Sequence, residues 1–218
     1  QGNANRRGKA AHPGKVDRNG LGDLGQLLPG IAGAERAPPR QELEAYREAA
    51  SCLANAGADL IALEMMGDTA HAARALQAAL ETKLPVWLGI SCKKTADGRI
   101  VSFDYPDVGL AEVLDALIPR GPAVINVMHS AIGAIPEAIE IVRQRWSGPV
   151  GVYPESGYFT SPTWNFVDVI SPADLVTEAL GWVAAGARLL GGCCGTSGSA
   201  GRRCGSSRRR HEAPGPGR

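Results

Sequence analysis

A chain of 218 residues, 44% hydrophobic and 21% charged, has the size and composition of one large globular domain or two small ones. A formal net charge of +1 predicts no general attraction to nucleic acid or acidic membranes. No apolar run approaches the roughly 20 residues of a membrane helix, and the polar N-terminal residues do not resemble a secretory signal. Five cysteines, two of them adjacent, argue against a secreted disulfide scaffold and favour a cytoplasmic protein.

Residues 1–29 are rich in Gly, Arg, Asn and Lys without a regular period, so we expect them to be mostly irregular. From residue 42 onward, apolar stripes at helical spacing alternate with short, uniformly apolar runs that are typical of strands buried on both faces. Ser171, followed by Pro172 and Asp174, has the pattern of a helix N-cap. The expected elements are helix 42–56, strand 59–65, helix 69–80, strand 85–91, helix 109–117, strand 123–128, helix 136–145, strand 149–153, helix 172–185 and strand 187–190.

Strands separated by single helices predict an α/β fold made of parallel βα units. Polar or special residues stand at the carboxyl ends of successive expected strands, and a closed barrel gathers those ends on one face, where the active sites of such barrels lie. We therefore predict a (β/α)8 TIM-type barrel over 30–196, followed by an Arg/Gly-rich disordered tail over 197–218. The strand-end residues are Glu64, Ser91, Cys92, Asn126, His129, Tyr153, Cys193 and Cys194.

Cys193 and Cys194 are adjacent at the end of the last expected strand, between glycines that permit close approach of backbone or ligand. Thiolates select zinc, and a catalytic zinc commonly has three protein ligands and one open position. The alternative is that the two cysteines are merely small apolar residues. We favour the metal site because the glycine-flanked pair lies at a barrel strand end.

The run Gly-Gly-Cys-Cys-Gly-Thr, together with AGADLIALEMM, GVYPESG and WNFVDVISPADLVTEALGWVAAGARLLGGCCG, resembles the homocysteine S-methyltransferase family. The resemblance covers roughly 30–196. It implies a (β/α)8 barrel in which zinc holds the homocysteine thiolate while a sulfonium or quaternary ammonium donor gives up a methyl group, forming methionine. It also implies that Glu64 binds the homocysteine amino group; the alternative is a salt bridge to another barrel residue.

Two departures from that family affect the expected site. The Asp-Gly-Gly stretch of the family's first strand has no counterpart in this sequence, because Asn19–Asp23 is not set in an expected strand. We therefore predict a barrel that is incomplete at its N-terminus and has about six βα units. The family's Asn-Cys at the sixth strand is replaced by Asn126 and Val127. His129 is the candidate third metal ligand. It lies two residues beyond Val127, about 6.6 Å further along an extended strand, so it can bind the metal only if the strand has already turned into a loop there. The alternative is a loop histidine without a role.

Asn126 and Tyr153 are expected either to orient polar groups of the substrate or to make structural hydrogen bonds. Glu155 stands where similar enzymes often carry Asn, and the sequence assigns it no role. Tyr158 and Trp164 are candidate aromatic partners for a positively charged donor. The expected partners are homocysteine and a small methyl donor, with self-association left open. Two rival interpretations remain: a barrel enzyme with an anion-binding loop over 191–201, and a truncated, non-catalytic barrel.

Overall fold

The computed structural model describes residues 21–23, 38–160, 163–166 and 169–196, and of residues 21–23 and 158–165 only the backbone. Its parallel strands are β1 (Leu21–Asp23), β2 (Leu60–Leu63), β3 (Val86–Lys94), β5 (Val124–Ala131), β6 (Val150–Glu155) and β9 (Leu189–Leu190). The helices are α1 (Pro39–Asn55), α2 (Thr69–Glu81), α3 (Leu110–Leu117), α4 (Ile135–Arg143) and α5 (Pro172–Ala184), with short 3-10 turns η2 (Ile118–Arg120) and η3 (Ile132–Ala134). All helices and strands expected between residues 42 and 190 are confirmed, with bounds shifted by a few residues.

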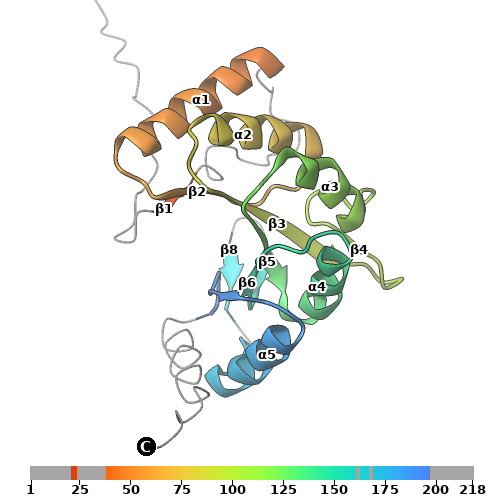
Figure 1. Ribbon diagram of the computed structural model, residues 1–218. Coiled ribbons are helices and arrows are strands. Elements are labelled where there is room, and N and C mark those ends of the chain that lie inside the picture. The colour runs from red at the N-terminus through yellow and green to blue at the C-terminus, as the bar shows by residue number, and fades with distance from the viewer. Residues whose placement is uncertain (1–20, 24–37, 161–162, 167–168, 197–218) are drawn as a thin grey trace, which may run out of the picture.

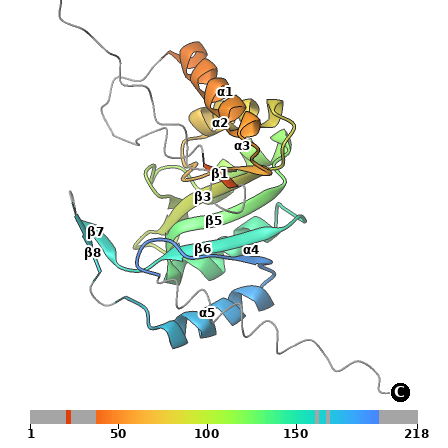
Figure 2. The same cartoon turned by 90° about the vertical axis from the view of Figure 1, so that its left-hand side faces the viewer.

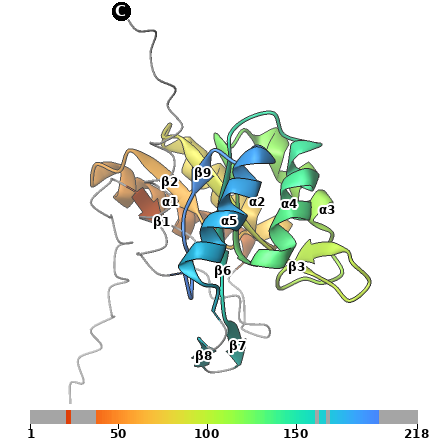
Figure 3. The same ribbon diagram turned by 90° about the horizontal axis from the view of Figure 1, so that it is seen from below.

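The parallel strands run in the order β1-β2-β3-β5-β6-β9, and each helix packs against the next one along the chain. Strand β4 (Ile100–Ser102) pairs antiparallel with β3, and β7 (Tyr158–Thr160) forms a hairpin with β8 (Thr163–Asn165) that projects from the sheet (Figure 3). Helices α1, α2, α4 and α5 lie above, behind and below the strands in Figure 2, as in the outer layer of a TIM-type barrel. Within the described residues β1 and β9 are both edge strands, so the structure is an incomplete barrel, as the sequence predicted.

Strand β1 differs from expectation, because residues 1–29 were predicted to be mostly irregular. Leu21–Asp23 pairs in parallel with Leu60–Ala62 of β2. A glycine-containing tripeptide has little strand propensity of its own, so the pairing is imposed by the free edge of β2. The rest of 1–29, the weak strand that the resemblance places near 28–34, and the tail 197–218 lie outside the described residues.

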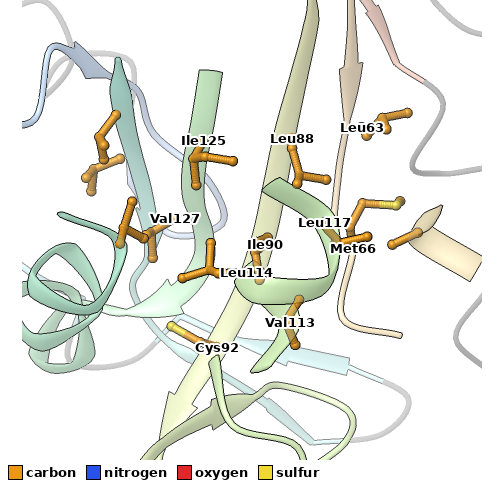
Figure 4. Packing of buried hydrophobic residues seen from close by; sticks show 14 of the residues in the cluster. Leu63, Met66, Leu88, Ile90, Cys92, Val113, Leu114, Leu117, Ile125 and Val127 are labelled. Atoms are coloured by element: carbon orange, nitrogen blue, oxygen red, sulfur yellow. The ribbon is translucent and has the colours of Figure 1, made fainter. Parts of the chain in front are cut away.

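The hydrophobic core lies between the sheet and the helices (Figures 1 and 4). Alternate residues of β2, β3, β5 and β6 point to it, and Leu88, Ile90 and Cys92 of β3 face Leu114 and Leu117 of α3 in Figure 4. The opposite face of the sheet is left for the barrel interior, where the polar strand residues fall. At α5, the Ser171 hydroxyl accepts a hydrogen bond from the Asp174 backbone N–H, as the N-cap pattern predicted. None of the helices in the described part of the chain has both the length and the apolar character needed to span a membrane.

Candidate metal centre

The two adjacent cysteines lie in a loop that is held against the end of β6. After β9, the Gly191 N–H donates to Val152 O at 2.9 Å, the Cys193 N–H to Pro154 O at 3.2 Å, and the Ser156 N–H to Cys194 O at 2.8 Å. Gly195 has φ 73°, and a Cβ added there would lie 1.5 Å from Ser156 O. The glycine after the cysteine pair is therefore required by this close approach, and it turns the chain so that both thiols remain beside the strand end.

His129 reaches the thiols because β5 is irregular at its end. Met128 pairs with Tyr153, but the next pair joins Ala131 to Glu155, so His129 and Ser130 face one residue of β6. This is a β-bulge, and bulges re-aim side chains. His129 has φ 43°, in the left-handed region.

The bulge is fastened by the buried Ser130. Its hydroxyl donates to Met128 O at 2.7 Å and accepts from the Cys92 N–H at 2.9 Å. Val127, by contrast, packs into the hydrophobic core with Ile125 (Figure 4). The structure thus supplies the turn that a metal-ligand role for His129 requires, while Val127 faces away from the thiols.

His129, Cys193 and Cys194 form a group whose potential ligand atoms all lie within 4.8 Å of one another. The two sulfur atoms are 4.0 Å apart, and Cys193 Sγ is 3.7 Å from His129 Nδ1. All three side chains are partly buried. The strand ends therefore bring together the three residues that the sequence singled out as metal ligands.

The charges of this group are mutually dependent. Burial alone would lower the pKa of His129, but the contacts with Cys193 and with the Glu155 carboxylate outweigh it and raise the pKa to about 9. Burial would raise the pKa of Cys193, but the His129 contact lowers it below its ordinary value. Burial and the neighbouring Cys193 raise the pKa of Cys194 to about 11. The His129 contact thus favours ionisation of Cys193 over that of Cys194.

Asn126 and Tyr153 lie on the face of the sheet opposite the core, and glycines make room for them. A Cβ added at Gly151 would lie 1.9 Å from Asn126 Oδ1, and one added at Gly89 would lie 3.0 Å from the Tyr153 hydroxyl. Asn126 is 1% exposed, and neither atom of its amide has a hydrogen-bond partner among the described residues. A buried amide without partners is costly, so this position calls for a partner that the described residues do not supply.

Glu64 directly follows β2, at the same end of the sheet, and is partly buried. Glu64 interacts with other groups of the protein. This is compatible with both roles considered for it, a salt bridge within the barrel and the binding of a substrate amino group. The side chains of Tyr158 and Trp164 lie outside the described part of the chain.

Two site residues were missed by sequence reasoning. Glu155, 8% exposed, places Oε2 at 2.9 Å from His129 Nδ1. Phe103, which follows β4, lies with its ring centroid 5.2 Å from that of His129. Glu155 could have been found as a carboxylate two residues beyond Tyr153 at the same strand end, whereas nothing in the local sequence of Phe103 points to the site.

The fold and this cluster define an α/β protein of the TIM-barrel class with two thiols and an imidazole at the carboxyl ends of its strands. The sequence profile described as homocysteine S-methyltransferase matches residues 17–200. The chain belongs to the homocysteine S-methyltransferase family.

Curated relatives and solved structures agree with this membership. The chain is 32% identical over 160 residues to homocysteine S-methyltransferase YbgG of Bacillus subtilis, covering 71% of this chain and 48% of that protein. It is 33% identical over 158 residues to homocysteine S-methyltransferase 4 of Zea mays, covering 70% of this chain and 45% of that protein. The chain thus spans about half the length of the curated relatives it matches.

Among solved structures, the chain is similar in fold to the homocysteine methyltransferase MmuM from Escherichia coli. The apo form aligns with a TM-score of 0.60 at 20% identity, covering 85% of this chain and 61% of that one. The metallated form aligns with a TM-score of 0.59 at 21% identity, covering 80% and 54%.

Proposed function

We propose that this protein transfers a methyl group from a sulfonium or quaternary ammonium donor to the thiolate of homocysteine, giving methionine, at a zinc site formed by Cys193, Cys194 and His129. The family membership supports the reaction class. The names of the matched relatives support homocysteine as the acceptor.

The observation that carries the zinc proposal is the geometry of the three ligand atoms. In tetrahedral coordination with Zn–S bonds of about 2.3 Å, two sulfur ligands lie about 3.8 Å apart. Cys193 Sγ and Cys194 Sγ are 4.0 Å apart, and a histidine nitrogen lies within 4.8 Å of both. Two thiolates and an imidazole are the donor set that zinc prefers, and three protein ligands leave a fourth position for a substrate sulfur.

Bound zinc would supply a Lewis acid that favours the thiolate form of homocysteine near neutral pH, where a free thiol with a pKa of about 8.5 is mostly protonated. The protein's own residues then orient the acceptor. Glu64 is proposed to pair with its amino group. The partnerless amide of Asn126 and the hydroxyl of Tyr153 are proposed to hydrogen-bond its polar groups.

The transfer balances without a redox partner. The homocysteine thiol loses its proton to water to become a thiolate, and the sulfur electron pair forms the new S–C bond. The bond between the methyl carbon and the positive sulfur or nitrogen of the donor breaks, and its electron pair stays on the donor. The donor leaves as a neutral thioether or tertiary amine group.

The described residues do not favour the anion-binding alternative. In the loop proposed to bind anions, the N–H groups of Gly191, Cys193 and Thr196 are already donated to carbonyl oxygens, which leaves fewer donors for a phosphate. A truncated, non-catalytic barrel would have the same incomplete sheet, so the activity measurement below distinguishes it from the proposal.

Metal analysis tests the site directly. The purified protein should bind about one zinc per chain, and the variant that combines Cys193→Ser with Cys194→Ser should lose it, because serine hydroxyls are poor zinc ligands. Cys52→Ser is the matched control, since Cys52 is an exposed thiol on α1. Zinc content that is unchanged in the double variant would refute the proposed site.

Activity is measured as methionine formed from homocysteine with S-methylmethionine or with betaine as donor. Turnover that disappears in the double variant and persists in Cys52→Ser supports the proposal. Zinc binding without methyl transfer from any sulfonium or quaternary ammonium donor would leave a metal site with another function.

A further inference from the structure

Strand order places the last residue of β6 between the two halves of the candidate metal centre. β6 lies between β5, which carries His129, and β9, which leads into Cys193 and Cys194 (Figure 2). That last residue is Glu155. Its neighbours Pro154 and Ser156 are hydrogen-bonded to the backbone of Cys193 and Cys194. The Glu155 backbone is therefore held rigidly relative to both thiols.

Glu155 contacts the imidazole but lies outside the group of ligand atoms. Oε2 is 2.9 Å from His129 Nδ1, a hydrogen-bond distance, whereas the same nitrogen is 3.7 Å from Cys193 Sγ. The described atoms that lie within 4.8 Å of one another belong to His129, Cys193 and Cys194, and Glu155 is not among them. This geometry fits a carboxylate that acts on the histidine better than one that acts as a ligand itself.

One ring nitrogen cannot both bind a metal and donate a hydrogen to Glu155. Glu155 Oε2 is buried and has no hydrogen-bond partner of good geometry among the described residues, while His129 Nδ1 lies 2.9 Å from it. If Nδ1 lost its hydrogen to a metal, a buried carboxylate would lose its donor, at a cost larger than that of an ordinary lost hydrogen bond. If Nδ1 keeps its hydrogen, Nε2 carries the free lone pair. The hydrogen bond at one ring nitrogen thus decides which nitrogen the metal takes.

We propose that Glu155 is a positioning residue of the metal centre: it accepts the Nδ1–H hydrogen bond of His129 and so presents Nε2 to the metal held by Cys193 and Cys194. This inference rests on the proposed zinc site. Histidines that bind metals commonly donate their other N–H to a carboxylate, which fixes the ring and increases the basicity of the ligating nitrogen. The left-handed backbone at His129 and the Ser130 hydroxyl set the position of the ring, and Glu155 sets its rotation and tautomer.

The nitrogen that binds the metal can be observed directly. The protein, with ¹⁵N-labelled histidine, is loaded with ¹¹³Cd, and correlation spectra separate Nδ1 from Nε2; the His129→Asn variant assigns the signals. The expected result is a one-bond coupling from cadmium to Nε2 of His129, with a protonated Nδ1. Coupling to Nδ1 would overturn the role of Glu155 while the metal site stood. Coupling to cysteines without any coupling to His129 would instead overturn the proposed ligand set.

Zinc affinity gives a second, independent measurement by competition with a chromophoric chelator. Glu155→Ala should weaken zinc binding about 10- to 100-fold, the usual loss on removing an outer partner of a ligand. Glu155→Gln keeps the size and one acceptor oxygen, so it should fold normally and lose less affinity than Glu155→Ala. Glu140→Gln, at an exposed carboxylate on α4, is the matched control and should bind zinc as the wild type does. Wild-type zinc affinity in Glu155→Gln and in any folded Glu155→Ala protein would refute the inference.

Discussion

His129 shows how a single residue is fitted to a site at a cost to the backbone. A non-glycine residue at φ 43° is uncommon, and such conformations persist only where surrounding contacts impose them. Here the contacts that impose this conformation are made by the Ser130 hydroxyl on one side and by Glu155 and Cys193 on the other. The strain is local, and it aims the imidazole at the two thiols.

Replacing His129 by Asn removes the imidazole while retaining a residue type that tolerates the left-handed region. Because a ligand contributes at least as much as its outer partner, we expect zinc affinity to fall by more than about tenfold. Chelator competition measures this loss, and thermal unfolding of the metal-free proteins shows whether the fold is retained. Zinc affinity equal to that of the wild type would mean that His129 is a loop residue without a role in metal binding.

At the scale of elements, helices α1 and α2 are joined by a buried polar cluster remote in sequence from the thiols. Glu42 on α1 accepts hydrogen bonds from Tyr46 at 3.0 Å and from Arg74 of α2 at 2.6 Å, and it pairs with His71 of α2. Burial by itself would raise the pKa of Glu42, but His71, Arg74 and Tyr46 outweigh it and lower the pKa below 4.5. The charged form of Glu42 thus binds the two helices together.

This cluster predicts a pH dependence of stability. Because the folded-state pKa of Glu42 is lowered, its contribution is fully present above the ordinary value of 4.5 and is lost as the pH falls below it toward the folded-state pKa. We expect Glu42→Gln to lower the free energy of unfolding by about 1–3 kcal/mol at pH 7. This difference from the wild type should become smaller in acid.

Urea unfolding at a series of pH values measures both effects. The matched control is Glu48→Gln, an exposed carboxylate on the same helix. If Glu42→Gln lost the same stability at every pH, the pairing of Glu42 with His71 and Arg74 would not be the cause.

At the scale of the whole molecule, the described part of the sheet ends in an unpaired strand edge on each side. Within the described residues β1 pairs only with β2, and β9 only with β6. Leu190 on β9 is 39% exposed. Unpaired strand edges are templates for pairing with another chain.

We therefore expect the 218-residue chain to self-associate as its concentration rises. Leu190→Lys should shift the distribution toward the monomer, because a charged side chain at a strand edge opposes pairing. Leu180→Lys is the matched control, since Leu180 is 49% exposed but lies on α5. Sedimentation velocity distinguishes the species. A monomer at all concentrations, for the wild type as for Leu190→Lys, would show that these edges are protected.

The order of elements could be predicted because each signal is local. Helical apolar spacing, the Ser171 cap and short apolar runs are signals carried by neighbouring residues. Helices α1 to α5 and strands β2, β3, β5, β6 and β9 were therefore expected near their observed places, whereas β4, β7 and β8 were not expected. The pairing of parallel strands with intervening helices then constrains the fold class. The metal site could also be predicted from the cysteine pair, because two adjacent thiols between glycines are rare and chemically specific.

Only the tertiary structure decided how the site is assembled. β1 and the bulge at His129 depend on contacts with β2 and β6, which are distant in sequence, and no local propensity encodes them. Glu155 acquires its place because β6 lies between β5 and β9, an order that strand pairing sets. Residue types thus determined which chemistry the chain can carry, whereas long-range pairing decided which atoms meet, because a hydrogen bond or a ligand contact forms only between groups that the backbone has brought within a few ångströms.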